Sequence, residues 1–142
     1  MQRALEQAYA ARAADEVPVG AVVIRAGRLI AEAHNRIRTD SDPTAHAELI
    51  AVRRAAARLG EARLPECILY ATLEPCAMCA GALVLARFRR LVYATPDPRS
   101  GMCGSLACIV QDPRLNHRLQ LSAGALRDEA GELLRAFFRA RR

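Results

Sequence analysis

The chain has 142 residues, 52% of them hydrophobic, which fits a globular domain and excludes a disordered chain. Its net charge is +6, and all 21 basic residues are arginine. This arginine excess indicates either a compositional bias or a polyanionic partner, and composition does not decide between them. No apolar run reaches the roughly 18–20 residues of a membrane helix, so we expect no membrane association.

In chain order, residues 1–14 are rich in alanine and predict a helix that residues 15–18 end. Apolar stretches at 19–24 and 29–33 flank a turn with glycine and predict two strands paired as a hairpin. The polar segment 35–44 contains a proline, which is typical of a loop.

The next segments alternate between helical and strand patterns. Residues 45–59 show helical spacing of apolar side chains, and Asp42 or Thr44 is the expected N-cap. An almost continuous apolar run at 67–71 predicts a strand that is buried on both faces. Residues 76–87 follow a proline and predict a second central helix.

The last third of the chain predicts two strands and one helix. Residues 91–94 predict a buried strand, 95–108 a long loop, and 118–121 a short edge strand. Residues 126–138 carry apolar side chains along one face of a final helix. The alternation of strands and helices predicts one α/β domain, a three-layer α/β/α sandwich around a mixed, mostly parallel central sheet, over residues 1–142.

Four residues of the two central helices have the chemistry of a catalytic metal site. His46, Cys76 and Cys79 supply one nitrogen and two sulfur ligands, which suit zinc. Three protein ligands leave a fourth tetrahedral position open, as in catalytic rather than structural sites. Both cysteines lie at a predicted helix N-terminus, which favours the thiolate form. Glu48 is close enough in sequence to exchange protons beside the metal.

Two other uses of the cysteines compete with this interpretation. A closed structural zinc site could take Cys67, Cys103 or Cys108 as its fourth ligand, but Glu48 would then have no role. A redox-active Cys-x-x-Cys pair would leave His46 unexplained. Cys67 and Cys108 are better explained as packed side chains. An odd cysteine count without a signal peptide predicts reduced thiols and a cytoplasmic protein.

His-x-Glu followed by Pro-Cys-x-x-Cys is the signature of zinc deaminases that act on nucleobases. The chain resembles the cytidine/deoxycytidylate deaminase superfamily, and more closely its bacterial tRNA-specific adenosine deaminases. The resemblance extends over nearly the whole chain and includes residues 16–21, Asn35, 42–48, 72–82, 104–106, 116–118 and 137–139. The zinc motif is shared by many deaminases, whereas Asn-His-Arg and the terminal Phe-Phe-Arg point to the tRNA branch.

The resemblance implies a cytidine-deaminase-like fold, one Zn²⁺ per subunit, Glu48 as the proton shuttle, and His46, Cys76 and Cys79 as the metal ligands. It implies that Asn35 contacts the nucleoside and that the pocket is lined by Val17, Ala47 and Leu73. Positions near the anticodon loop are Asp97, Arg99 and Asn116, together with Phe137, Phe138 and Arg139 of the last helix.

The function that the resemblance implies is conversion of adenosine to inosine at the wobble position of a tRNA anticodon, typically of an arginine tRNA, by a homodimer. One alternative is a deaminase of a free base or nucleotide, such as guanine, cytosine or deoxycytidylate. Truncation after Leu134 should distinguish the two, because only an RNA enzyme needs the basic last helix. Another alternative is a non-catalytic RNA-binding protein, which the intact Glu48 argues against.

The last helix can be interpreted in two ways. A pair of phenylalanines is more often part of a core than a platform for base stacking, so burial is the first expectation for Phe137 and Phe138. The arginines of this segment either form a solvated helix end or contact phosphates, and they are Arg135, Arg139, Arg141 and Arg142.

Overall fold

The computed structural model describes residues 1–141 and contains a five-stranded sheet in the order β2-β1-β3-β4-β5. The strands are β1 (Gly20–Arg25), β2 (Arg28–His34), β3 (Cys67–Leu73), β4 (Arg90–Thr95) and β5 (Gln120–Ala123). β1 pairs antiparallel with β2 and β3, whereas β3–β4 and β4–β5 are parallel pairs. The sheet is therefore mixed, and both the predicted hairpin and the predicted edge strand are present.

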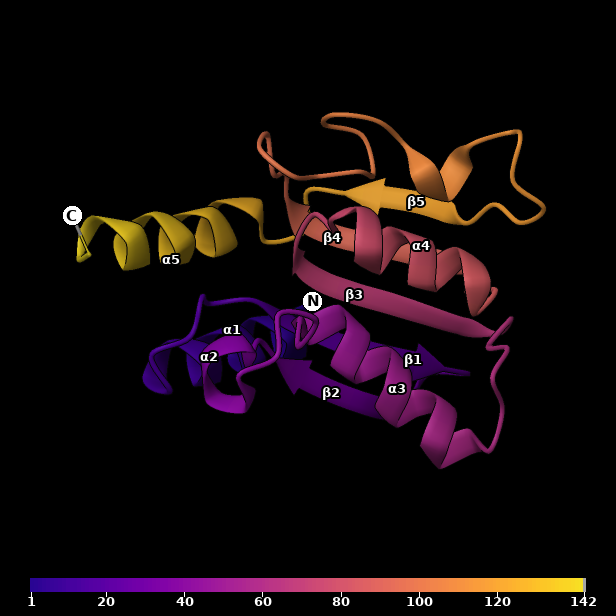
Figure 1. Ribbon diagram of the computed structural model, residues 1–142, viewed down its shortest axis with the longest axis horizontal. Helices are drawn as coiled ribbons and strands as arrows, with labels where there is room; N and C mark the ends of the chain where they lie inside the picture. Colours follow the sequence, from indigo (N-terminus) through magenta and orange to yellow (C-terminus); the bar gives the residue numbers. More distant parts are fainter. Residues whose placement is uncertain (142) are drawn as a thin grey trace.

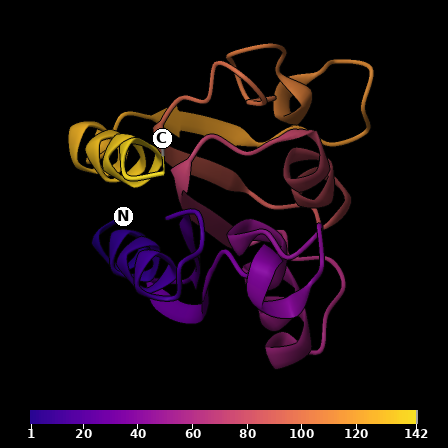
Figure 2. The same ribbon diagram turned by 60° about the vertical axis from the view of Figure 1, so that its left-hand side comes forward.

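Helices cover both faces of this sheet (Figure 1). They are α1 (Gln2–Ala13), α2 (Ile37–Asp40), α3 (Ala47–Leu59), α4 (Ala77–Leu85) and α5 (Arg127–Arg139), with a short 3₁₀ turn at Ile109–Gln111. Figure 2 shows α1 and α5 on one side of the sheet and α3 and α4 on the other. This arrangement confirms the predicted three-layer α/β/α sandwich. Within residues 1–141, no helix combines the length and the apolarity that crossing a membrane requires.

Two local predictions were wrong. The segment 35–44, predicted as a loop, contains the one-turn helix α2. The predicted caps of α3 also fail, because His46 occupies the N-cap position. Asp42 instead accepts the Thr44 backbone N–H at 2.7 Å in a local turn, so its carboxylate is not available to the helix.

The main core fills the space between the sheet and the helices α3 and α4. Leu69, Leu83 and Phe88 are fully buried there, and so is Cys67, which confirms its predicted packing role. A smaller apolar cluster on the opposite face joins α1 to α5 through Leu5, Ala8, Ala94, Ala130 and Leu133. These two clusters hold the helices rigidly against the sheet, and the functional side chains lie at the ends of these elements.

Close packing of α1 on β1 depends on Gly20. A Cβ atom at this position would lie 2.0 Å from the Ala4 carbonyl oxygen and 2.6 Å from the Ala8 backbone nitrogen. Only glycine lets the helix backbone approach the strand so closely. Because α1 leads directly into the segment before β1, this contact also determines where residues 15–19 lie.

Candidate metal centre

The three predicted ligands meet at the N-termini of α3 and α4. His46 and Cys76 are the N-cap residues of these helices, and Cys79 lies in the first turns of α4. The His46 Nδ1 atom is 3.8 Å from the Cys76 Sγ atom and 3.6 Å from the Cys79 Sγ atom. All three ligand atoms lie within 4.8 Å of one another, as a shared metal ion requires.

These distances fit zinc. With Zn–S near 2.3 Å and Zn–N near 2.0–2.1 Å, tetrahedral geometry places a sulfur and a nitrogen ligand roughly 3.6 Å apart. The two sulfur-to-nitrogen distances agree with this value. Within residues 1–141, no fourth His, Cys, Asp or Glu ligand joins the group, which argues against a closed structural site.

The cluster favours a thiolate on Cys76. Hydrogen bonds from the Cys79 thiol and from His46 lower the pKa of Cys76 to about 3. The hydrogen bond to Cys76 raises the pKa of both Cys79 and His46. The position of Cys76 at the start of α4 adds the favourable field of the helix dipole. Cys76 is therefore in the form that binds metals.

Glu48 places a carboxylate in the same pocket. It lies in the first turn of α3, two residues after His46, and only 4% of its surface is exposed. Burial raises the pKa of Glu48 above its ordinary value of 4.5. A carboxyl group with a raised pKa exchanges protons more readily near neutral pH, which is the property of a general acid–base group.

The metal cluster opens into a pocket of about 180 Å³. Its apolar lining residues are Val17, Val19, Ile37 and Leu73. The polar lining residues are Asn35, His46, Glu48, Glu74, Cys76, Asp97 and Ser100. A small pocket that combines apolar surface with a few polar groups is typical of a site for a small molecule or a single nucleobase.

The predicted pocket residues fall into two groups. Asn35, Val17, Leu73 and Asp97 line the pocket together with the metal cluster. Ala47 is not among the residues that line the pocket; it is fully buried at the first position of α3, between His46 and Glu48.

Four lining residues were missed by sequence reasoning. Val19 alternates with Val17 along an extended segment, so a strand pattern could have indicated it. Ile37 was missed because α2 was predicted as a loop. Nothing local distinguishes Glu74 or Ser100 as lining residues.

Glu74 organises the loop that closes one side of the pocket. Its buried carboxylate accepts the backbone N–H groups of Asp97 at 2.9 Å, Cys103 at 3.0 Å and Ser105 at 2.9 Å, and also the Ser105 hydroxyl. Burial alone would raise the pKa of Glu74, but these hydrogen bonds outweigh it and lower the pKa. Gly101 passes so close that a Cβ atom there would lie 2.3 Å from the Glu74 carboxyl carbon.

Apart from Asp97, the residues predicted to lie near the anticodon loop are outside the pocket. Arg99 is exposed beside Asp97, and Asn116 is exposed in the loop before β5. On α5, Phe137 is 5% exposed and belongs to the packed interior, whereas Phe138 is 50% exposed. Arg139 is exposed and pairs with Glu132 at 2.5 Å. The two phenylalanines therefore have different roles, and Arg142 lies outside the described residues.

Comparison with protein families gives a match over the whole chain. The family model described as MafB19-like deaminase covers residues 1–142. A tRNA-specific adenosine deaminase from Bacillus subtilis (strain 168) is 43% identical over 139 residues, which are 98% of this chain and 86% of that protein. A tRNA-specific adenosine deaminase from Agrobacterium fabrum is 45% identical over 142 residues, which are 100% of this chain and 93% of that protein.

Solved structures agree with these relatives. A structure from a study of A-to-I editing by tRNA:A34 deaminases at the wobble position of transfer RNA superposes with a TM-score of 0.91. The two sequences are 44% identical, and the superposition includes 94% of this chain and 97% of the solved chain. The guanine deaminase from Nitrosomonas europaea gives a TM-score of 0.83 at 30% identity, over 96% of this chain and 81% of its own.

Proposed function

Since the chain belongs to the tRNA-specific adenosine deaminases, within the MafB19-like deaminase family, we propose that it converts adenosine to inosine at the wobble position of a tRNA anticodon. The observation that carries the proposal is the meeting of the His/Cys/Cys group with a buried carboxylate in one partly apolar pocket. Following the resemblance, we expect an arginine tRNA to be the substrate.

His46, Cys76 and Cys79 would hold one zinc ion in each subunit. When bound, zinc supplies a nucleophile at neutral pH, because it lowers the pKa of water from 15.7 to about 7. The ligand distances and the thiolate character of Cys76 support this assignment. The same pocket would admit the substrate beside these ligands, since His46 and Cys76 line it.

Glu48 would transfer the protons of the reaction. It takes one proton from the attacking water and delivers it to N1 of adenine. It then takes the second proton from the new hydroxyl group on C6 and delivers it to the nitrogen that leaves from C6. Adenosine and water thereby give inosine and ammonia. A positioned carboxylate contributes about 10²–10⁴-fold to such a step. The Ala47 N–H lies at the start of α3, where helix N–H groups lack intrahelical acceptors, and it can donate to the reacting oxygen.

The pocket walls would hold the extruded base and its sugar. Val17 and Leu73 provide apolar surface for the base, and Asn35 provides the polar contact to the nucleoside. Asp97 lines the pocket on the side formed by the loop whose backbone binds Glu74. Extruding a base costs a few kcal/mol, and less where it is unpaired, so an anticodon base is a favourable target.

The anticodon loop would extend from the pocket over exposed side chains. Phe138 offers an aromatic face for stacking, and Arg139 and Arg99 offer positive charge to phosphates. Asn116 lies at the other end of β4, where its carbonyl accepts a hydrogen bond from Arg87, so it is not part of this surface within one subunit. Truncation after Leu134 would also remove the packed Phe137, so single substitutions at exposed positions are the cleaner test of RNA binding.

We further propose a homodimer in which both subunits contact the RNA. Leu85 on α4 is 81% exposed, and Met78 on the same helix is also exposed, which supports an apolar contact between copies. Light scattering at several protein concentrations would test the dimer. The five free cysteines support a reducing compartment, which for this proposal is the cytoplasm.

The decisive experiment measures inosine at the wobble adenosine of an arginine-tRNA transcript, with zinc-replete wild type beside Glu48→Ala. Wild type should convert the adenosine, and Glu48→Ala should bind zinc normally but lose turnover by at least about 10²-fold. Glu66→Ala, at an exposed position away from the pocket, is the matched control and should retain the wild-type rate. A Glu48→Ala enzyme with near-native turnover would contradict the proposed proton transfer.

A second candidate, guanine deamination, is favoured by the structural similarity to the guanine deaminase of Nitrosomonas europaea. The curated relatives at 43–45% identity make it the weaker candidate. Ammonia release from free guanine by wild type, without conversion of any tRNA, would make guanine the better assignment.

A further inference from the structure

One fully buried carboxylate has no role in the reaction described so far. Glu16 exposes 0% of its surface, as deeply buried as the hydrophobic core. The other two buried glutamates, Glu48 and Glu74, both line the pocket, whereas Glu16 lies behind it. Burying a carboxylate is costly unless hydrogen bonds compensate for the lost hydration. The position therefore needs a physical reason.

The end of α1 places Glu16 by backbone geometry. Asp15 adopts a left-handed conformation with φ of 59°. The Asp15 N–H bonds to the Arg12 carbonyl at 3.1 Å, and the Glu16 N–H bonds to the Ala11 carbonyl at 2.9 Å. These two bonds form a Schellman motif, which ends the helix and turns the chain sharply. Glu16 thus leaves a rigid helix end at a defined angle.

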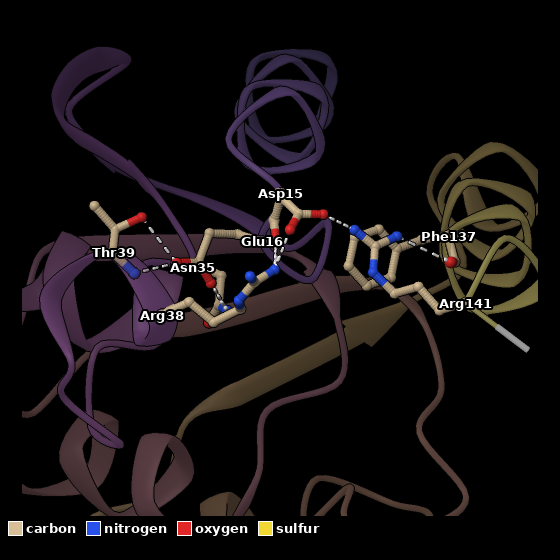
Figure 3. A network of polar contacts seen from close by, with 7 residues as sticks. All are labelled: Asp15, Glu16, Asn35, Arg38, Thr39, Phe137 and Arg141. Carbon is tan, nitrogen blue, oxygen red and sulfur yellow. Dashed lines mark hydrogen bonds and ion pairs between the residues drawn. The ribbon is translucent and has the colours of Figure 1, made fainter.

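The carboxylate of Glu16 binds two neighbouring elements (Figure 3). One oxygen accepts the Thr39 backbone N–H at 2.7 Å and the Thr39 hydroxyl at 2.9 Å. The other oxygen accepts the side-chain amide of Asn35, with 3.3 Å between Nδ2 and Oε2. Thr39 belongs to α2, which also carries Ile37 of the pocket wall. Glu16 therefore supports the pocket from behind at two points.

The bond to Asn35 determines which atom of the amide faces the pocket. A carboxylate can only accept hydrogen bonds, so Asn35 must turn its Nδ2 donor toward Glu16. The Oδ1 acceptor is then left for the pocket, which Asn35 lines. The Asn35 backbone N–H bonds to the Val19 carbonyl at 3.0 Å, so the residue itself is also held in place.

We propose that Glu16 is a positioning residue that fixes the Asn35 amide as a hydrogen-bond acceptor toward the substrate. The site then selects a nucleoside that presents a hydroxyl or N–H group at this point and disfavours one that presents only an acceptor. This inference rests on the proposed function and adds to it the control of substrate recognition from outside the pocket.

Glutamine at position 16 reverses this arrangement. Its amide can keep one oxygen for Thr39 and point its NH₂ group at Asn35, which must then rotate and offer Oδ1 to it. The Asn35 NH₂ group would face the pocket, where it cannot accept a hydrogen bond from the substrate. We expect Glu16→Gln to lower kcat/KM on the tRNA stem-loop by roughly 10- to 100-fold, with zinc content unchanged.

Swapping the two groups provides the specific test. In Glu16→Gln/Asn35→Asp, the new glutamine donates to the new aspartate, whose second oxygen again faces the pocket as an acceptor. The net charge of the pair is the same as in wild type. Asn35→Asp alone places two carboxylates against each other and should be less active than the swapped pair. A role of Glu16 that acts only through Thr39 of α2 predicts no such rescue.

The experiment measures kcat/KM on the stem-loop and zinc content for wild type, Glu16→Gln, Asn35→Asp and the swapped pair. Glu61→Gln, the same change at a partly exposed carboxylate that pairs with Arg25, is the control and should equal wild type. Wild-type activity in Glu16→Gln, or a swapped pair no better than Asn35→Asp, overturns the inference. If wild type fails to deaminate the RNA, the proposed function fails instead, so the two failures are distinct.

If Glu16→Gln does not fold, the comparison between Asn35→Asp and the swapped pair still decides the question. A binding measurement adds a readout that does not depend on turnover. In the Glu48→Ala background, adding Glu16→Gln should weaken stem-loop binding at constant salt concentration. Equal dissociation constants for the two proteins would count against the inference.

Discussion

Replacing Glu74 tests how strongly the pocket loop depends on one carboxylate. Glu74→Ala leaves three backbone N–H groups, those of Asp97, Cys103 and Ser105, without their acceptor. Each buried donor without an acceptor costs about 1–3 kcal/mol, so three donors cost about 3 kcal/mol at least and about 9 kcal/mol at most. Water that enters the loop can replace part of the lost hydrogen bonding, which keeps the expected cost below about 5 kcal/mol. We therefore expect the free energy of unfolding to fall by roughly 3–5 kcal/mol.

Glu74→Gln is the milder form of the same perturbation. One oxygen of the amide still accepts hydrogen bonds, but the NH₂ group now meets a backbone donor. We expect a loss of about 1–3 kcal/mol. Urea denaturation at pH 7 with equal excess zinc measures the difference as a shift of the midpoint at constant m-value. Glu132→Gln, on the exposed surface of α5, is the matched control and should stay within about 0.5 kcal/mol of wild type.

The pH dependence provides an independent check. Because the folded pKa of Glu74 lies below its ordinary value of 4.5, the ionised carboxylate stabilises the protein above pH 4.5. This contribution disappears as the pH falls through the lowered folded pKa. The stability gap between wild type and Glu74→Gln should therefore be constant above pH 4.5 and narrow in more acidic solution. Equal midpoints at pH 7, or a gap that widens on acidification, would refute this reasoning.

Two further predictions concern packing. Gly20→Ala places a methyl group 2.0 Å from the Ala4 carbonyl oxygen and should lower the free energy of unfolding by roughly 3 kcal/mol, which thermal unfolding can measure. Phe137→Ala should destabilise the protein by about 3–5 kcal/mol, whereas Phe138→Ala should leave stability within about 0.5 kcal/mol and weaken stem-loop binding. A Phe138→Ala protein that binds the stem-loop as wild type does would exclude base stacking on this ring.

Sequence patterns predicted the elements well because each pattern reflects local physics. Alternating and continuous apolar runs identified all five strands, with ends that differ by at most about two residues from the structure. The helix α2 was missed because a single turn has too few residues for a periodic signal. The prediction that Asp42 or Thr44 caps α3 was wrong because the Asp42 carboxylate accepts a hydrogen bond within its own turn. Local hydrogen bonds of this kind compete with capping of a following helix.

The candidate site was predictable to the extent that its residues share a compact motif. His46, Cys76 and Cys79 have ligand chemistry that can be recognised from type and spacing. Glu16 and Glu74 lack such a signal, because their partners lie 19–31 residues away in the chain and meet them only through tertiary packing. Which of Phe137 and Phe138 is buried depends on how α5 is rotated about its axis. Two adjacent phenylalanines in the sequence do not determine that rotation.

The cluster that joins α1 to α5 connects two helices that lie far apart in the sequence. Leu5 packs with Ala130 and Leu133, and Asp15 forms an ion pair with Arg141. During synthesis, this side of α1 stays uncovered until α5 leaves the ribosome, roughly 5–25 s after α1 itself at typical elongation rates. Although α1 is made well before α5, its packing is completed only when α5 is present. A nascent chain that stalls before α5 would present Leu5 to chaperones and proteases.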